Sequence, residues 1–271
     1  MLVRIEVERR LATSPQIAAQ FLPVDTSSDT VLLPVFPERD RDRARQAAPE
    51  ELWEIRGDLD GQEHVATMLD VLGRNGVDTA TFARVLDFGC GTGRMLREVH
   101  QAGVAAELWG VDINAASIDW CQRHLTPEMQ FAVCTSQPSL PFADGRFDFV
   151  YAGSVFTHLS ELGDSWACEL HRLLGSSGHL YITVQDGASV RVLLDLAPDN
   201  EVIQCVHEAR GLLDQLGSKY SVVSVGRGSK DAMVFHDRAS LARRWEGLFE
   251  LVAAEENAYG HQTGLLFRRR S

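Results

Sequence analysis

The stretch Val85-Leu86-Asp87-Phe88-Gly89-Cys90-Gly91-Thr92-Gly93-Arg94 decides the fold of this chain. An apolar strand ends in an acidic residue, glycines follow at every second position, and a helix then begins. Glycines at this spacing let the backbone turn sharply and approach a ligand closely, because no Cβ intervenes. Such a turn is the usual place for a nucleotide-like ligand in an open α/β sheet. The stretch therefore predicts a ligand site at the carboxyl edge of a sheet.

The spacing of the glycines indicates the kind of ligand. It reads D-x-G-x-G-x-G, whereas dinucleotide enzymes carry G-x-G-x-x-G and hold a pyrophosphate at the helix N-terminus. An acid before the glycines suits a ligand that carries positive charge. The spacing speaks against a nicotinamide oxidoreductase, and a test of NAD binding decides that alternative.

Strands and helices alternate from about residue 83 to residue 185. Strands are expected at residues 105–111, 147–152 and 179–184, and Asn114 is expected to cap a helix that runs to about His124. Asp112 ends the first of these strands, roughly 20 residues after the glycine turn, where an acid can hold a ribose diol. The alternation predicts a largely parallel sheet.

These elements, in this order, resemble the class I S-adenosylmethionine-dependent methyltransferases of the small-molecule type. The resemblance implies an α/β, Rossmann-like fold with a seven-stranded, mostly parallel sheet and helices on both faces. It also implies an antiparallel C-terminal strand pair and, here, a helical insertion after the fifth strand. The implied cofactor is S-adenosyl-L-methionine, which carries an ammonium and a sulfonium and no phosphate; the product is S-adenosyl-L-homocysteine.

The chain is expected to divide into four segments. Residues 1–60, rich in proline, predict an N-terminal arm or cap, and residues 61–186 predict the cofactor-binding core. Residues 187–232 are extra material, with a helix expected from Asp199 to Gly217. We interpret them as a substrate lid, against a dimerisation element or plain packing. Residues 233–271 are expected to complete the core with a helix and antiparallel strands.

The resemblance carries residue roles over to matching positions. Asp87 would hold the ammonium of the methionine end, and Asp112 would hold the ribose hydroxyls. The other implied cofactor contacts are Phe88, Gly89, Gly91 and Gly93 in the turn, Ile113 against the adenine, Thr135 after the third strand, and Tyr151, Ala152 and Gly153 along the methionine.

His158 is the candidate catalytic base. It follows the fourth strand at the edge that faces the substrate, and an imidazole titrates near neutral pH. The alternative is that His158 caps a short helix or hydrogen-bonds a loop. Further candidate substrate contacts are Gln185, Asp186, His236, Tyr259 and His261.

Composition narrows the substrate class. The chain has 271 residues, 45% of them hydrophobic, and a formal net charge of −12, which speaks against nucleic-acid binding. The fourth strand also lacks the Asn- or Asp-Pro-Pro-aromatic sequence typical of enzymes that methylate DNA bases. A small molecule is therefore the expected acceptor, at a hydroxyl first and an amine second. The alternative from a different class is a regulatory or scaffolding protein that binds the cofactor without transferring methyl.

Other signals point to a cytoplasmic protein, as a monomer or homodimer. No apolar run is long enough to span a bilayer, and charges at Arg4 and Glu6 come too early for a signal peptide. Five cysteines without regular spacing indicate reduced thiols. Two C-x-x-H pairs, at residues 121–124 and 168–171, fall in helices that follow different strands, so no metal site is expected.

Overall fold

The structure is a computed structural model that describes residues 23–24, 31–32, 59–160, 162–199, 201–226 and 233–271. The expected arm, residues 1–60, lies outside the described residues except at its last two positions and two short strands. These strands, β1 (Pro23–Val24) and β2 (Val31–Leu32), pair antiparallel.

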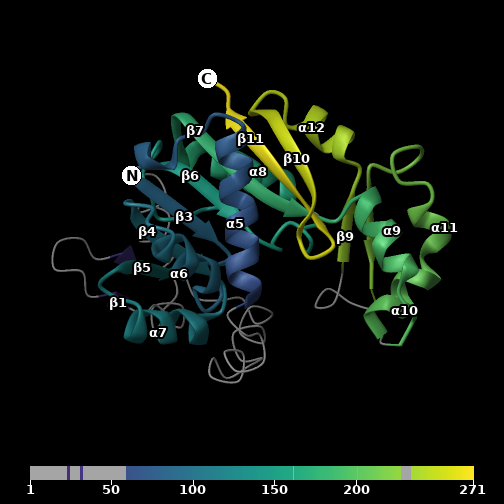
Figure 1. Ribbon diagram of the computed structural model, residues 1–271, viewed down its shortest axis with the longest axis horizontal. Coiled ribbons are helices and arrows are strands. Elements are labelled where there is room, and N and C mark those ends of the chain that lie inside the picture. Colours follow the sequence, from purple (N-terminus) through teal and green to yellow (C-terminus); the bar gives the residue numbers. More distant parts are fainter. Residues whose placement is uncertain (1–22, 25–30, 33–58, 161, 200, 227–232) are drawn as a thin grey trace, which may run out of the picture.

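A seven-stranded sheet forms the centre of the protein, in the order β10-β11-β7-β6-β3-β4-β5 (Figure 1). Its strands are β3 (Arg84–Phe88), β4 (Glu107–Asp112), β5 (Met129–Val133), β6 (Phe147–Ala152), β7 (Leu174–Val184), β10 (Phe249–Tyr259) and β11 (Gln262–Arg269). Strands β3 to β7 are mutually parallel, and β11 runs antiparallel to both β7 and β10. The expected sheet and its antiparallel C-terminal strand pair are confirmed.

Helices cover both faces of this sheet, so its strands are apolar on both sides. The helices of the core are α5 (Leu59–Arg74), α6 (Arg94–Gln101), α7 (Ala115–His124), α8 (Gly163–Leu173) and α12 (Arg238–Arg244), with a short 3-10 helix, η1 (Thr79–Thr81). One face of β3 places Leu86 in a cluster with Trp166 of α8, while Val85 joins Met68 of α5 on the other face. Figure 1 shows α5 lying in front of the sheet.

Helix starts follow the capping signals in the sequence. The Asn114 side chain accepts hydrogen bonds from the backbone N–H groups of Ala116 and Ser117, as expected. Asp237 caps α12 by accepting from the Ser240 N–H at 2.9 Å. This helix ends at Arg244, shortly before β10 begins.

Residues 187–236, called the insertion below, form a small unit beside the sheet, on the right of Figure 1. Its elements are α9 (Gly187–Asp195), α10 (Glu201–Glu208), α11 (Arg210–Leu213), β8 (Val222–Val225) and β9 (Met233–His236). Val206, Leu213 and Phe235 belong to a hydrophobic cluster of its own.

The insertion differs from the expectation in three ways. It is not only helical, because β8 and β9 pair antiparallel. The boundary expected between residues 232 and 233 separates these paired strands, so β9 belongs with the insertion. The helix expected from Asp199 to Gly217 is interrupted at Ala209, between α10 and α11.

Backbone hydrogen bonds hold the insertion to the carboxyl edge of the sheet. The His236 N–H donates to the Gln185 carbonyl at the end of β7, and the Val234 N–H donates to the Thr157 carbonyl after β6, both at 2.8 Å. At the other end, the Ser189 hydroxyl of α9 donates to the His261 carbonyl at 2.7 Å. The insertion is therefore attached to the core through both α9 and β9.

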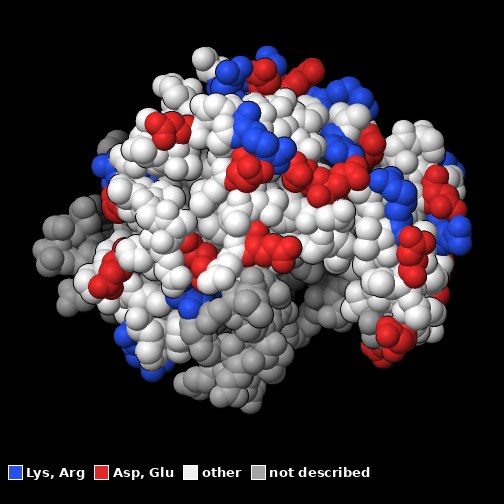
Figure 2. Space-filling model, in the orientation of Figure 1, with Lys and Arg blue, Asp and Glu red and all other residues white. Residues whose placement is uncertain are grey.

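Charges of both signs are interspersed on the surface. On the face shown in Figure 2, basic and acidic side chains lie next to one another along the upper edge and over the insertion. Arg74 pairs with Glu255 at 2.8 Å, and Arg238 pairs with Glu256 at 3.1 Å. In the described part of the chain, no helix combines the length and apolar character needed to cross a membrane.

Candidate functional site

The turn after β3 requires glycine and leaves space for a ligand. Gly89 and Gly91 have φ angles of +84° and +54°, which side chains rarely adopt. A Cβ on Gly89 would lie 2.3 Å from Cγ2 of Val155, whereas nothing lies within 4 Å of a Cβ built on Gly91. The turn is therefore closely packed beneath Gly89 and open at Gly91.

Asp112, at the end of β4, contacts this turn directly. Its Oδ2 accepts from the Gly91 N–H at 2.8 Å, and its Oδ1 accepts from the Asn114 N–H at 2.7 Å. A carboxylate oxygen has two lone pairs and can accept more than one hydrogen bond, so these contacts are compatible with a bound diol. The structure thus brings together two residues that the sequence predicted for one site.

Asp87, at the end of β3, is a buried carboxyl group that suits a cationic ligand. It is 2% exposed, and burial is the main reason why its pKa rises to about 8. The Tyr151 hydroxyl favours the charged form, Asp112 opposes it, and Arg94 favours it more weakly. A group with this pKa is mostly protonated at pH 7, and an ammonium beside it would favour the carboxylate.

This environment predicts that ligand binding releases a proton from Asp87. At a pH of about 6.5 the free protein holds the proton, and binding of the ammonium of S-adenosylhomocysteine should release about one proton per ligand. The release should diminish as the pH rises through about 8, the pKa of the free group. Calorimetric titrations in buffers of different ionisation enthalpy measure it. Asp87→Asn should abolish the release, and an undiminished release in that variant would contradict the assignment.

Arg94, the first residue of α6, belongs to a polar cluster that the sequence analysis missed. Its guanidinium donates to the Tyr259 hydroxyl and lies 3.3 Å from Nδ1 of His64. The rings of His64 and Tyr259 stack, with centroids 3.9 Å apart. A Cβ on Gly153 would lie 3.0 Å from the Tyr259 ring. Tyr259, expected at the substrate, therefore lies beside Gly153 in contact with Arg94 and His64. Only the arginine directly after the glycine turn signals this cluster in the sequence.

The residues expected near the adenine lie along the ends of β4 and β5. The Cys134 N–H donates to the Asp112 carbonyl at 2.9 Å and holds the loop after β5 beside β4. Thr135 is 6% exposed, and its hydroxyl oxygen accepts from the Gln137 N–H. Ile113 is partly buried, and Phe88 is buried against Trp166, with ring centroids 4.5 Å apart.

Two residues expected along the methionine are wholly buried. Tyr151 and Ala152 are 0% exposed because helices cover both faces of β6, so their side chains present no surface at the edge. The side chain of Tyr151 lies with the α5 and α6 cluster, and Ala152 lies with the cluster on the other face. Gly153, the next residue, remains partly exposed.

Two of the expected substrate contacts have structural partners. Asp186 is the N-cap of α9, accepts from the Ala188 N–H at 2.9 Å, and lies 3.2 Å from Nε of Arg238. Nε2 of Gln185 lies 3.3 Å from Nε2 of His261, whose pKa is lowered by burial. Gln185 is 4% exposed and Asp186 is 1% exposed, so neither side chain is open to a substrate in this structure.

His236 lines a hollow between the insertion and the core. The hollow has a volume of about 160 Å³. Its lining combines apolar side chains, among them Phe156 and Trp245, with the charged side chains of Asp164 and Arg244. Nε2 of His236 lies 3.3 Å from the Phe156 carbonyl. Burial lowers the pKa of His236, which favours the neutral ring.

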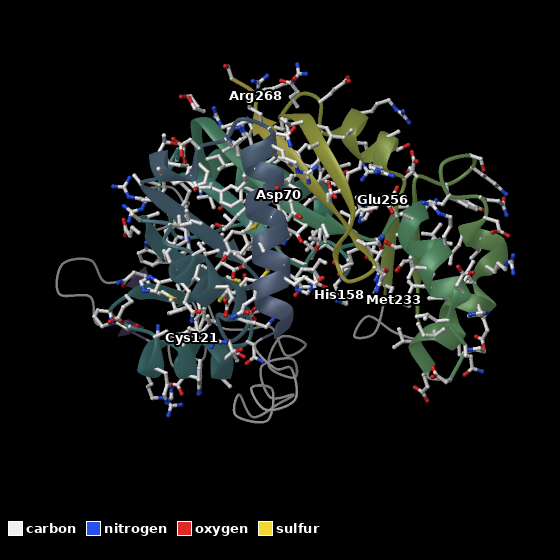
Figure 3. The ribbon with its side chains drawn as sticks, in the orientation of Figure 1. Asp70, Cys121, His158, Met233, Glu256 and Arg268 are labelled. Carbon is white, nitrogen blue, oxygen red and sulfur yellow. The ribbon has the colours of Figure 1, made fainter. Side chains whose placement is uncertain are left out.

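His158 is exposed in the loop after β6. Its backbone N–H donates to the Val155 carbonyl at 3.0 Å. Figure 3 shows His158 near Met233 at the lower end of the sheet, and the hydrogen bond between Thr157 and Val234 confirms that these segments adjoin. His158 therefore lies where the carboxyl edge meets the insertion.

The two C-x-x-H pairs have separate surroundings. The Cys121 thiol donates to the Gly91 carbonyl at 3.6 Å, and burial raises its pKa to about 12. Cys168 is exposed, and His171 bonds the Arg270 carbonyl. Across the described ranges, no group of three or more His, Cys, Asp or Glu side chains is placed to hold a metal ion.

Known proteins similar to this chain are methyltransferases. Residues 86–182 match the methyltransferase domain family. Malonyl-[acyl-carrier protein] O-methyltransferase of Legionella pneumophila is 31% identical over 101 residues, which cover 37% of this chain and 35% of that protein. Phthiotriol/phenolphthiotriol dimycocerosates methyltransferase 1 of Mycobacterium ulcerans is 32% identical over 154 residues, covering 54% and 49%. The matches thus span half or less of these relatives' own lengths.

A solved structure shares the fold over nearly the whole chain. It is Burkholderia thailandensis 1,6-didemethyltoxoflavin-N1-methyltransferase, solved with 1,6-didemethyltoxoflavin and S-adenosylhomocysteine bound. The TM-score is 0.56 at 16% identity, and the match covers 93% of this chain and 95% of that one. This likeness supports the Rossmann-like methyltransferase fold.

Proposed function

We propose, from the membership of this chain in the class I S-adenosylmethionine-dependent methyltransferases, that it transfers a methyl group from S-adenosylmethionine to a small molecule. The observation that carries the proposal is the pair of acids at the ends of adjacent strands, joined through the glycine turn. Asp87 is a buried carboxyl group whose charged form a bound cation would stabilise. Asp112 accepts a hydrogen bond from the Gly91 N–H at 2.8 Å. A hydroxyl is the preferred acceptor and an amine the second. Similarity to both an O-methyltransferase and an N-methyltransferase supports a hydroxyl or an amine as the acceptor group.

We assign the methionine end of the cofactor to Asp87 and to Arg94 with its two neighbours. Asp87 holds the ammonium, and Arg94, with Tyr259 and His64 around it, holds the carboxylate. Opposite charges at the two groups fix the direction in which the amino acid lies. When bound, S-adenosylmethionine supplies a methyl group already activated by its sulfonium. The chain contributes alignment, which can account for roughly 7–11 kcal/mol of the barrier.

The nucleoside end is assigned to the neighbouring strands. Asp112 holds the ribose hydroxyls, and Ile113 and Thr135 lie beside the adenine. Phe88, Tyr151 and Ala152 support the site from within the core, because their side chains are buried. Gly91 leaves open space through which the cofactor can approach the backbone, whereas Gly89, Gly93 and Gly153 let the backbone pack against side chains of the protein.

On the acceptor side, we assign the insertion as a fixed cover and His158 as the group that takes or orients the acceptor's proton. The attachment of β9 to Gln185 and Thr157, and the cap that Asp186 makes on α9, favour a fixed cover over a mobile lid. The hollow lined by His236 offers space of mixed polar and apolar character next to the loop that carries His158. His236 is the remaining candidate contact from the insertion.

Removing the insertion tests its role. The His236 N–H bonds the Gln185 carbonyl, so the two ends of the segment lie close together and a short Gly-Ser linker in place of residues 187–235 can join them. This variant should keep its affinity for S-adenosylhomocysteine, because the glycine turn lies elsewhere, and it should lose methyl transfer. Calorimetry and a transfer assay measure the two properties. Retained transfer would show that the segment is no cover, and failure to fold would show that it is part of the core.

A panel of acceptors tests the proposed function. Labelled S-adenosylmethionine is supplied with phenols, aliphatic alcohols, carboxylic acids and heterocyclic amines, and methylated products are detected by mass spectrometry. Labelled product from a hydroxyl or amine compound supports the proposal. Tight cofactor binding without product over the whole panel would favour the alternative, a regulatory or scaffolding protein that binds the cofactor.

A further inference from the structure

We infer that a closed hydrogen-bond network around Ser154 positions the loop after β6 for the acceptor, with Thr183 and Gln262 as its positioning residues. The Ser154 network consists of Ser154 and Thr157 in the loop, Thr183 in β7 and Gln262 in β11. These four residues fasten the segment that carries His158. The inference rests on the proposed methyl transfer for its functional part only.

Ser154 has an unusual backbone conformation. Its φ angle is +58°, and among the described residues only Ser154 and Asn257 combine a positive φ with a side chain. Such a conformation costs on the order of 1–3 kcal/mol and persists when the surroundings over-determine it. Ser154 follows Gly153 directly, so the outlier lies at the edge where the proposed ligands meet. Glycine would adopt this φ at lower cost but would lack the hydroxyl.

Three hydrogen bonds tie Ser154 to two strands of the core. The Ser154 N–H donates to Oγ1 of Thr183 at 2.7 Å, and that hydroxyl donates to Oε1 of Gln262 at 2.6 Å. Nε2 of Gln262 then donates back to Oγ of Ser154 at 2.9 Å. Thr183 has one proton to give and gives it to Gln262, so the orientation of the Gln262 amide is fixed.

Thr157 closes the network and extends it to the insertion. Its hydroxyl donates to the Ser154 carbonyl at 3.1 Å, so the 3.3 Å contact between the two hydroxyls takes its proton from Ser154. The Thr157 carbonyl accepts from the Val234 N–H of β9 at 2.8 Å. Thr157, Thr183 and Gln262 are 1%, 0% and 6% exposed. One buried network thereby joins the loop to β7, β11 and the insertion.

This arrangement indicates that the Ser154 network positions the loop after β6, in addition to any contribution it makes to the stability of the fold. A fully satisfied buried network rigidifies the groups it joins. The group it places is the turn from Ser154 to His158, which borders both the carboxyl edge and the insertion (Figure 3). In-line transfer is sensitive to displacements of about 1 Å in the residues that orient the acceptor. The sheet itself does not need the network, because β7 and β11 pair through their backbones at six consecutive positions, from Val184 with Thr263 to His179 with Arg268.

Paired substitutions of threonine test the inference. Thr183→Val removes the hydroxyl and keeps the shape, whereas Thr183→Ser keeps the hydroxyl. Thr263→Val is the matched control, because Thr263 lies on β11 next to Gln262, is 0% exposed, and has a hydroxyl with no hydrogen-bond partner among the described residues. Hydrogen exchange of residues 154–158 and 233–236, affinity for S-adenosylhomocysteine, and transfer to whichever panel acceptor turns over are measured on each full-length variant.

We expect Thr183→Val to raise amide exchange in both segments by about tenfold or more, because local opening becomes easier. Its affinity for S-adenosylhomocysteine should stay within about twofold, while kcat falls about tenfold or more with little change in KM. Thr183→Ser should restore both properties, and Thr263→Val should leave both unchanged. Unchanged exchange in Thr183→Val, or equal losses of kcat in Thr183→Val and Thr263→Val, would overturn the inference. Absence of S-adenosylhomocysteine binding in the wild type would overturn the proposed function instead. Comparing amide exchange in Thr183→Val and Thr263→Val would still show whether the Ser154 network holds the loop in place.

Discussion

Asp112→Ala is expected to weaken binding of S-adenosylhomocysteine by about 10²–10⁴-fold. The substitution removes both oxygens assigned to the ribose hydroxyls, and a hydrogen bond to a charged acceptor is worth about 1.5–3 kcal/mol. It also removes the acceptor for the Gly91 N–H. The substitution therefore weakens the glycine turn and removes a hydrogen-bond partner of the ligand. Isothermal titration calorimetry with the purified variant measures the loss.

Two further variants make this result specific. Asp112→Asn keeps one acceptor oxygen without the charge and should give an intermediate affinity. Asp119→Ala is the control, because Asp119 is an exposed acid on α7 that pairs with Arg123. This variant should keep the wild-type affinity for S-adenosylhomocysteine. An unaltered affinity in Asp112→Ala would reject the assignment of the ribose to this residue.

His158→Ala is expected to lower kcat by about 10²–10⁴-fold if the imidazole is the general base. Affinity for S-adenosylhomocysteine should barely change, because His158 is not among the side chains assigned to the cofactor. In the wild type, the rate should fall as the pH drops through the pKa of the imidazole, since only the neutral ring accepts a proton. Steady-state kinetics across pH, on an acceptor found with the panel, measure both effects.

The size and pH dependence of the effect separate two roles of His158. A ring that only orients the acceptor predicts a smaller loss and little pH dependence, because alignment does not need the lone pair. His124→Ala is a suitable control, since His124 is an exposed imidazole at the end of α7 that bonds the Trp120 carbonyl. Wild-type turnover in His158→Ala would reject both roles and leave a structural residue.

The sequence predicted the parts of the fold that depend on local signals. Strand β6 was expected at residues 147–152 and occurs there, and Asn114 and Asp237 begin helices as their side chains suggest. These features depend on residues within a few positions of each other. The contact between Asp112 and the glycine turn follows from parallel strands ending at one edge.

Features that join distant segments were not predictable in this way. The cluster of His64, Arg94 and Tyr259 brings together three elements that no pattern connects in the sequence. The pairing of β8 with β9 joins residues on either side of the boundary expected between residues 232 and 233, and no local pattern signals that pairing. The burial of Tyr151 likewise depends on helices from elsewhere in the chain.

Calorimetric titration of the wild-type protein with S-adenosylmethionine, S-adenosylhomocysteine and NAD tests the central claim most directly. Asp87 and Asp112 are placed for a cationic nucleoside without phosphate, so both sulfur ligands should bind at about one per chain and NAD should not bind. Binding of NAD, or no measurable binding of either sulfur ligand by the folded protein, would contradict the account.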